Sequence, residues 1–162
     1  MSYEEEIKME NETPTIFEWM GGRPVLRRLL KKFYAKVEVD EMLAPLFKHM
    51  PPDHHEHVAM WFEEVLGGEP LYTEERGGFK NMIKMHRGRA IKPEQRDRWV
   101  ELMMETVEEV DLPQDPEFRA AFVGYIEFGS RRALSNSQPG APMPTRETIL
   151  KWGWGVAPPG TP

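Results

Sequence analysis

The sequence predicts an all-α protein with one main domain, and three observations support this fold class. No segment alternates polar and apolar residues as a strand does, whereas several segments repeat apolar residues every three to four positions. Glycine and proline separate these segments into lengths typical of helices. A chain of 162 residues has the length of a single domain.

The first strong helix is expected to begin at Pro24, because proline is favoured in a first helical turn and a Gly-Gly pair precedes it. Apolar residues recur at helical spacing as far as Val37, and basic residues occupy the other side. This pattern predicts an amphipathic helix that is buried along one face. A short helical stretch is expected to follow and to end at Phe47.

Three further helices are expected, over residues 53–66, 93–110 and 117–136. Asp53 is a possible N-cap of the first, and a second Gly-Gly pair ends it. The acid pair Glu63-Glu64 within it is expected on a solvated face. Between residues 69 and 93 the periodicity is broken, with one weak helical piece over residues 79–85.

The two ends of the chain differ from the middle in composition. Residues 1–12 form an acidic N-terminal extension without the basic start and apolar centre of a secretory signal. Residues 13–137 form the helical domain. Residues 138–162, the C-terminal extension, are rich in proline and glycine. Within it, residues 145–154 are expected to form a short helix that packs on the domain or at a dimer contact.

Charge and cysteine content exclude several classes of function. A net charge of -6 disfavours nucleic acid or an anionic membrane surface as the main partner. No apolar run is long enough to span a bilayer. With no cysteine, the chain has neither disulfides nor thiolate ligands for a metal. These features together predict a cytoplasmic protein. No phosphate-binding loop or serine-nucleophile motif is present.

A histidine cluster at residues 54–57 is one candidate site. His54 and His57 are three residues apart, so both could face the same side of a helix and hold a metal ion such as zinc. For His55 and His57, a polar, solvated helix start is the more frequent explanation. His54 differs, because it shares the apolar stripe of its helix with Val58. A structural histidine of the core is the alternative there.

His86 is the second candidate. It follows Met82 and Met85 and could be an axial ligand of iron in an apolar pocket, or a half-exposed residue that ends a weak helix. Trp99 and Tyr34 each carry an N–H or O–H donor on an otherwise apolar side chain. If they face one cavity they could stabilise a bound polar diatomic molecule, and otherwise they are core residues.

Taken in order, these segments resemble the truncated haemoglobins, and within them the second group. The resemblance covers residues 16–136. Its motifs are Phe33-Tyr34-Ala35-Lys36-Val37, Phe47 thirteen residues after Tyr34, Gly67-Gly68, Leu71-Tyr72-Thr73-Glu74-Glu75-Arg76-Gly77, and His86 with Trp99 thirteen residues later.

The resemblance implies a two-over-two helical sandwich that encloses non-covalent haem b, with His86 as the protein ligand of the iron. Tyr34 and Trp99 would donate hydrogen bonds to a ligand on the opposite face. Counting back from Gly67 places His54 nearest the iron there. Counting forward from Phe47 places His55 there, and the apolar stripe favours His54, which could also bind the iron itself.

The remaining contacts to haem are also implied by the resemblance. Tyr72 and Lys84 are the expected partners of a haem propionate. The full set of expected haem-binding residues is Phe47, Val58, Trp61, Tyr72, Met82, Lys84, Met85, His86, Ile91, Trp99 and Met103.

The expected function is reversible binding of O2, NO and CO, in NO or reactive-species detoxification or peroxidase-like redox chemistry, with a separate reductase as partner. One alternative is a haem-based sensor or interaction module that signals through the C-terminal extension. Another is a helical domain without haem, with structural histidines or a zinc site at His54 and His57. No contact with nucleic acid or membrane is expected, and the protein is expected to be a monomer or a homodimer.

Overall fold

The computed structural model describes residues 2–161, without the side chains of residues 8–11, and this part of the chain contains only helices and the loops that join them. The predicted all-α class is therefore confirmed.

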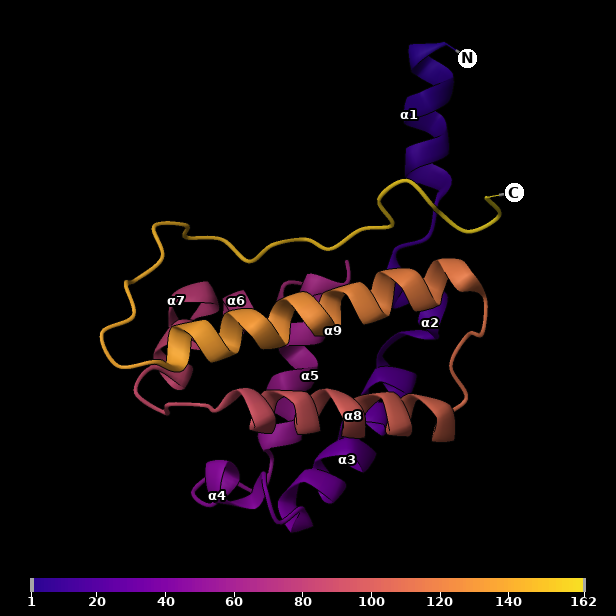
Figure 1. Cartoon of the computed structure of the whole chain (residues 1–162). Coiled ribbons are helices and arrows are strands. Elements are labelled where there is room, and N and C mark those ends of the chain that lie inside the picture. Colours follow the sequence, from indigo (N-terminus) through magenta and orange to yellow (C-terminus); the bar gives the residue numbers. More distant parts are fainter. Residues whose placement is uncertain (1, 162) are drawn as a thin grey trace.

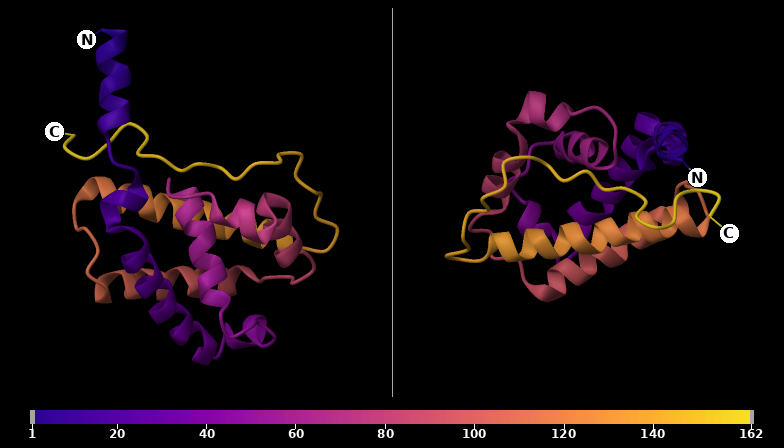
Figure 2. Two further views of the ribbon diagram at one scale, coloured as in Figure 1. Left: turned by 180° about the vertical axis from the view of Figure 1, so that it is seen from behind. Right: turned by 90° about the horizontal axis from the view of Figure 1, so that it is seen from above.

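Four helices form two crossed layers. Helices α8 (Pro93–Glu109) and α9 (Pro116–Ser137) lie in front in Figure 1, and α3 (Gly22–Val39) and α5 (His54–Val65) lie behind them. Helix α3 packs against both α5 and α8, and α8 packs against α9. Figure 2 shows the same two layers from behind and from above. This arrangement is the expected two-over-two sandwich.

The buried face of α3 follows directly from its sequence. Its buried side chains recur every three or four residues, so they lie along one side of the helix. They are Leu26, Leu29, Leu30, Phe33, Tyr34 and Val37. The helix begins two residues before Pro24, at a Gly-Gly turn. Gly21 has a φ of 115°, and a Cβ there would lie 2.5 Å from the side chain of Val25, so only glycine fits the turn.

The shorter helices complete the domain. The expected helical pieces are present as α4 (Ala44–Phe47) and α7 (Gly78–His86). Helices α1 (Tyr3–Glu12), α2 (Ile16–Met20) and α6 (Leu71–Arg76) were not expected. Helices of five or six residues are too short to show an apolar repeat, and α1 is mostly acidic. Helix α1 stands clear of the two layers (Figures 1 and 2).

The C-terminal extension differs from the expectation, because residues 145–154 are not helical. Trp152 and Trp154 both reach the domain. Side chains two residues apart share a side in an extended chain but not in a helix. The Trp152 amide donates to the Val65 carbonyl at 2.7 Å, and its indole donates to the Ala121 carbonyl at 2.9 Å. The extension therefore packs on the domain, as expected, but in an extended form.

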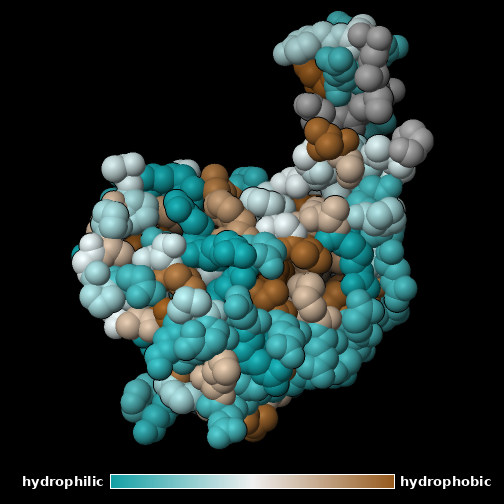
Figure 3. Space-filling model, viewed as in Figure 1, coloured by the Kyte–Doolittle hydropathy of each residue, from teal (hydrophilic) through white to brown (hydrophobic). Residues whose placement is uncertain are grey.

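Figure 3 shows hydrophilic side chains over most of one face, with hydrophobic ones gathered between α8 and α9. No helix within residues 2–161 has the length and apolar character needed to cross a bilayer.

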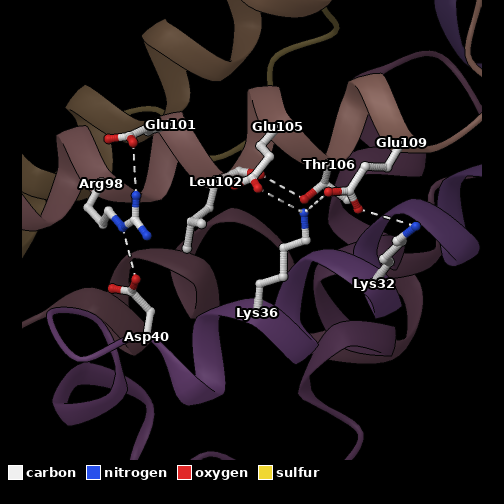
Figure 4. Close-up of polar contacts among 9 residues, drawn as sticks. All are labelled: Lys32, Lys36, Asp40, Arg98, Glu101, Leu102, Glu105, Thr106 and Glu109. Atoms are coloured by element: carbon white, nitrogen blue, oxygen red, sulfur yellow. Dashed lines mark hydrogen bonds and ion pairs between the residues drawn. The ribbon is translucent and has the colours of Figure 1, made fainter.

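Ion pairs join α3 to α8 (Figure 4). Lys36 contacts Glu109 at 2.5 Å, and Lys32 contacts the same carboxylate at 3.2 Å. At the other end Arg98 contacts Asp40 at 2.8 Å. Each pair is at least partly exposed and contributes at most about 1 kcal/mol. Their placement at both ends of the contact holds the two helices in one register.

The expectation that Glu63 and Glu64 face solvent is wrong. Both are buried, with Arg23 of α3 and Thr73 of α6 packed against them. Each carboxylate has a partner that compensates for its burial. Arg23 binds Glu63 through two hydrogen bonds of 2.8 Å, and the amide of Thr73 donates to Glu64 at 2.8 Å.

Candidate functional site

The two layers enclose a largely apolar cavity of about 630 Å³. Its size is typical of sites for small cofactors. Most of the residues that the sequence assigned to haem or its ligand line it. These are Tyr34, Phe47, His54, Val58, Trp61, Tyr72, Met82, Met85, His86, Ile91 and Trp99.

Two of the expected haem-binding residues do not line this cavity. Lys84 lies on the exposed side of α7, because the helix turns its other side, with Met82 and His86, toward the cavity. Met103 lies one helical turn beyond Trp99 and is completely buried in the core. The apolar period of α8 shows that both Trp99 and Met103 face inward, but it does not distinguish a cavity wall from the core.

His86 is the last residue of α7 and is held in one orientation. Its Nδ1–H donates to the carbonyl of Met82, one turn earlier, at 2.9 Å. Its Nε2 has no hydrogen-bond partner among the described residues. Burial lowers the pKa of His86, so the imidazole is neutral at neutral pH. A neutral, oriented imidazole with a free nitrogen at an apolar cavity is suited to binding a metal ion of a cofactor.

An aromatic cluster lies at the cavity on the side of α3 and α5. The ring of His54 contacts Tyr34 edge-on, with centroids 5.0 Å apart, and lies 5.7 Å from Phe47. Trp99 packs at right angles against Phe33, at 5.0 Å. These contacts bring together residues from α3, α4, α5 and α8. The sequence placed Tyr34, His54 and Trp99 together only through the family resemblance.

The polar atoms of this cluster are available as donors. Burial raises the pKa of Tyr34 well above its usual value. Tyr34 therefore keeps its proton at any physiological pH. The N–H of Trp99 and the O–H of Tyr34 both belong to residues that line this largely apolar cavity, where a donor can stabilise a polar ligand more strongly than it would in water.

The burial of His54 can be tested through the pH dependence of the stability of the protein. Burial and the nearby positive charges, of which His57 is the largest, lower the pKa of His54 to about 4. The unfolded chain then binds more protons than the folded chain between about pH 4 and 6.5. The contribution of neutral His54 to stability is thus complete above pH 6.5 and is lost as the pH falls toward 4.

We therefore expect the cofactor-free His54→Gln variant to lose less stability than the wild type between pH 7 and pH 4.5. The difference is at most about 3 kcal/mol, at roughly 1.4 kcal/mol for each pKa unit. Urea unfolding at the two pH values measures it, and His49→Gln controls for removing an exposed histidine elsewhere. Parallel losses in His54→Gln and the wild type would show that His54 is not held neutral.

Two further hydrogen bonds join residues that line the cavity. The indole of Trp61 donates to the hydroxyl of Tyr125 at 2.6 Å, and the amide of Asn81 donates to the hydroxyl of Tyr72 at 3.1 Å. The rings of Trp61 and Tyr72 meet edge-on at 5.3 Å. The Tyr72 hydroxyl accepts a hydrogen bond and still has its own proton to donate.

Four arginines at the cavity lack an acidic partner, and the sequence analysis missed them. Within the described residues no carboxylate lies at ion-pair distance from Arg76, Arg89, Arg132 or Arg146, although this acidic chain pairs most of its other arginines. Unpaired cations at an apolar cavity fit a ligand with negative groups at its edge. Nothing in the local sequence marks these four residues, because their approach depends on how the helices and the C-terminal extension pack.

The zinc alternative receives no support from the geometry. Among the residues that the structure describes, no three side chains of the metal-binding types lie together. The Nε2 atom of His57 contacts Arg76 and lies 3.3 Å from Asp53. His57 is thus engaged by neighbours other than His54.

Comparisons with known proteins identify the family of this chain. The model of the bacterial-like globin family matches residues 15–128. The group 2 truncated haemoglobin of Bacillus subtilis is 27% identical over 117 residues, which cover 72% of this chain and 86% of the relative.

Two solved structures extend the comparison. The haemoglobin of the thermophilic phototrophic bacterium Chloroflexus aurantiacus is 31% identical, with a TM-score of 0.67, over 75% of this chain and 98% of that one. A truncated oxygen-avid haemoglobin from Bacillus subtilis is 26% identical, with a TM-score of 0.66, over 75% and 99%. The expected resemblance to group II truncated haemoglobins is confirmed, and the chain belongs to the bacterial-like globin family.

Proposed function

We propose that this protein binds haem b without a covalent link and uses it to convert NO and O2 to nitrate. The observation that carries the proposal is the pairing, across one apolar cavity, of the free His86 Nε2 with the hydrogen-bond donors Tyr34 and Trp99. Bound haem would supply an iron atom at which O2, NO or CO binds and one-electron chemistry takes place.

The residues of this chain fit haem in three ways. His86 offers a neutral imidazole nitrogen to the iron, and the bond from its Nδ1–H to Met82 fixes the ring orientation. The apolar lining suits the flat ring. The arginines without acidic partners suit the two propionates, and Arg76, close to His57 and Tyr72, is the one nearest to the tyrosine that the resemblance assigned to this role.

The donors Tyr34 and Trp99 favour strong retention of O2 over its delivery. A donor in a water-poor cavity stabilises the partial negative charge of a polar diatomic ligand and slows its escape. The related protein of Bacillus subtilis is described as oxygen-avid, which supports the same property here. Slow release is unsuited to O2 transport and gives NO time to react with O2 held in the cavity.

The reaction balances as NO plus O2 plus one electron, giving nitrate. The reduced, haem-loaded protein would supply this electron once, and a separate one-electron donor, a reductase, would have to restore it after each turnover. The role of the protein is to hold O2 in orientation beside the site where NO arrives.

The test is NO consumption by the haem-loaded, reduced protein in the presence of O2. We expect one nitrate for each NO consumed, with a single turnover unless a reducing system is added. An NO electrode and nitrate analysis measure both quantities. A protein that binds haem and O2 but releases NO unchanged would disprove the enzymatic role, and one that takes up no haem would disprove the proposal as a whole.

A further inference from the structure

We propose that the C-terminal extension forms part of the haem site, as a wall of the cavity that slows the loss of haem. The inference rests on the proposed haem binding. It concerns residues that lie beyond the segment matched by the family model, which ends at residue 128.

Three residues of the extension line the cavity, although they follow the last helix in sequence. They are Pro144, Arg146 and Leu150. Seen from above in Figure 2, the extension turns back after α9 and passes across the molecule between α9 and helices α5, α6 and α7. The cavity reaches this same region, because residues of all four helices also line it. The extension therefore covers the cavity where these helices leave it uncovered.

The extension is anchored on both sides of the lining residues. Before them, the side-chain amide of Gln138 donates to the carbonyl of Ile91 at 2.8 Å. After them, Trp152 is held by its amide and its indole and packs against Phe128, with centroids 5.3 Å apart. The indole of Trp154 donates to the carbonyl of Pro14 at 2.7 Å. Anchors at both ends make this segment a fixed wall.

Arg146 places a positive charge at this wall. Its guanidinium lies over the ring of Phe79, 4.3 Å from the centroid, and its Nε–H donates to the carbonyl of Thr148 at 2.9 Å. No carboxylate of the described residues pairs with it. Burial raises the pKa of Tyr125, another residue of the cavity, and the positive charge of Arg146 partly opposes this shift. The wall thus combines apolar contacts from Pro144 and Leu150 with an unpaired cation.

A haem that leaves the cavity has to lose its contacts with the C-terminal extension, or the extension has to detach from the domain first. Both events oppose dissociation, since each removes buried apolar contact and, for a ligand with carboxylates, an attraction to Arg146. The side chains of Arg146 and Leu150 should therefore change the rate of haem loss more than the stability of the cofactor-free domain, because Arg146 is only partly buried and Leu150 is exposed.

The experiment measures haem transfer from the full-length, haem-loaded protein to an excess of apomyoglobin. The test variant is Arg146→Ser with Leu150→Ser, which leaves the tryptophan anchors intact. Its matched control is Arg131→Ser with Val156→Ser, an arginine and an aliphatic residue that are exposed and do not line the cavity. We expect haem loss about tenfold faster in the test variant and within about twofold of wild type in the control.

Melting of the cofactor-free proteins separates retention from folding, and the test variant is expected to melt within a few degrees of wild type. Hydrogen exchange of the wild type gives a second readout that needs no variant. Amides of residues 145–152 are expected to exchange more slowly when haem is bound. Equal haem loss in test and control variants, or exchange in this segment that haem leaves unchanged, overturns the inference. A wild type that binds no haem overturns the proposed function as well.

Discussion

Replacing His86 by alanine is expected to abolish stable haem binding or to convert it to a form with an altered spectrum. His86 offers the only imidazole nitrogen at the cavity that is both oriented by the backbone and free of other partners among the described residues. Removing a partner that merely orients a metal ligand weakens a site by 10- to 100-fold, so loss of the ligand itself should exceed about 100-fold. Haemin titration, followed by ferric, ferrous and CO-bound spectra, measures the effect.

Two controls make the His86 result specific. Imidazole added to His86→Ala is expected to restore a spectrum close to wild type, because a free imidazole can occupy the vacated position. His49→Ala, which removes an exposed histidine that does not line the cavity, is expected to keep the wild-type spectrum. If His86→Ala bound haem and CO exactly as the wild type does, the iron ligand would be another residue, and His54 would be the next candidate.

Replacing Trp99 by phenylalanine is expected to speed O2 dissociation by about 10- to 100-fold. The substitution keeps an aromatic ring against Phe33 but removes the indole N–H. A hydrogen bond that is lost in a buried site, with its partner left unsatisfied, has a free energy of about 1–3 kcal/mol, and 1.4 kcal/mol corresponds to a tenfold change. Stopped-flow displacement of O2 by CO measures the rate.

Tyr34 and the ligand itself provide the controls for Trp99. Because Trp99 and Tyr34 both line the cavity and both pack against Phe33, the effects of Trp99→Phe and Tyr34→Phe are expected to be non-additive in the double variant. CO accepts hydrogen bonds weakly, so its dissociation should change much less than that of O2. An equal acceleration for both gases would instead indicate that Trp99 acts only by filling space.

The pattern of apolar residues was enough to predict the four long helices, because each buries apolar residues that recur every three or four positions. Helix α3 shows this best, with six buried residues at helical spacing. The order and spacing of Tyr34, Phe47, His86 and Trp99 were enough to indicate the family. These predictions succeeded because the spacing of residues along the chain decides which side chains share one face of a helix, whatever the rest of the fold.

Other features depend on contacts between distant segments, and the sequence alone could not decide them. Glu63 and Glu64 resemble solvated acids until Arg23 and Thr73 pack over them. Met103 and Trp99 have the same helical phase, yet only Trp99 reaches the cavity. Lys84, two residues before His86, is expected to contact a propionate, and the structure places it on the exposed side of its helix, outside the lining of the cavity.

The sequence by itself therefore determined the helical class, the family and the residues expected on the two sides of the haem iron. Only the tertiary structure decided which charged groups meet the cavity and what covers it. Arg146 reaches the site because Trp152 and Trp154 hold the extension against the domain in an extended form. Helical periodicity arises from neighbours three or four residues apart, so a local pattern in the sequence is enough to show it. The position of the C-terminal extension depends instead on hydrogen-bond partners more than thirty residues away, and no local pattern indicates them.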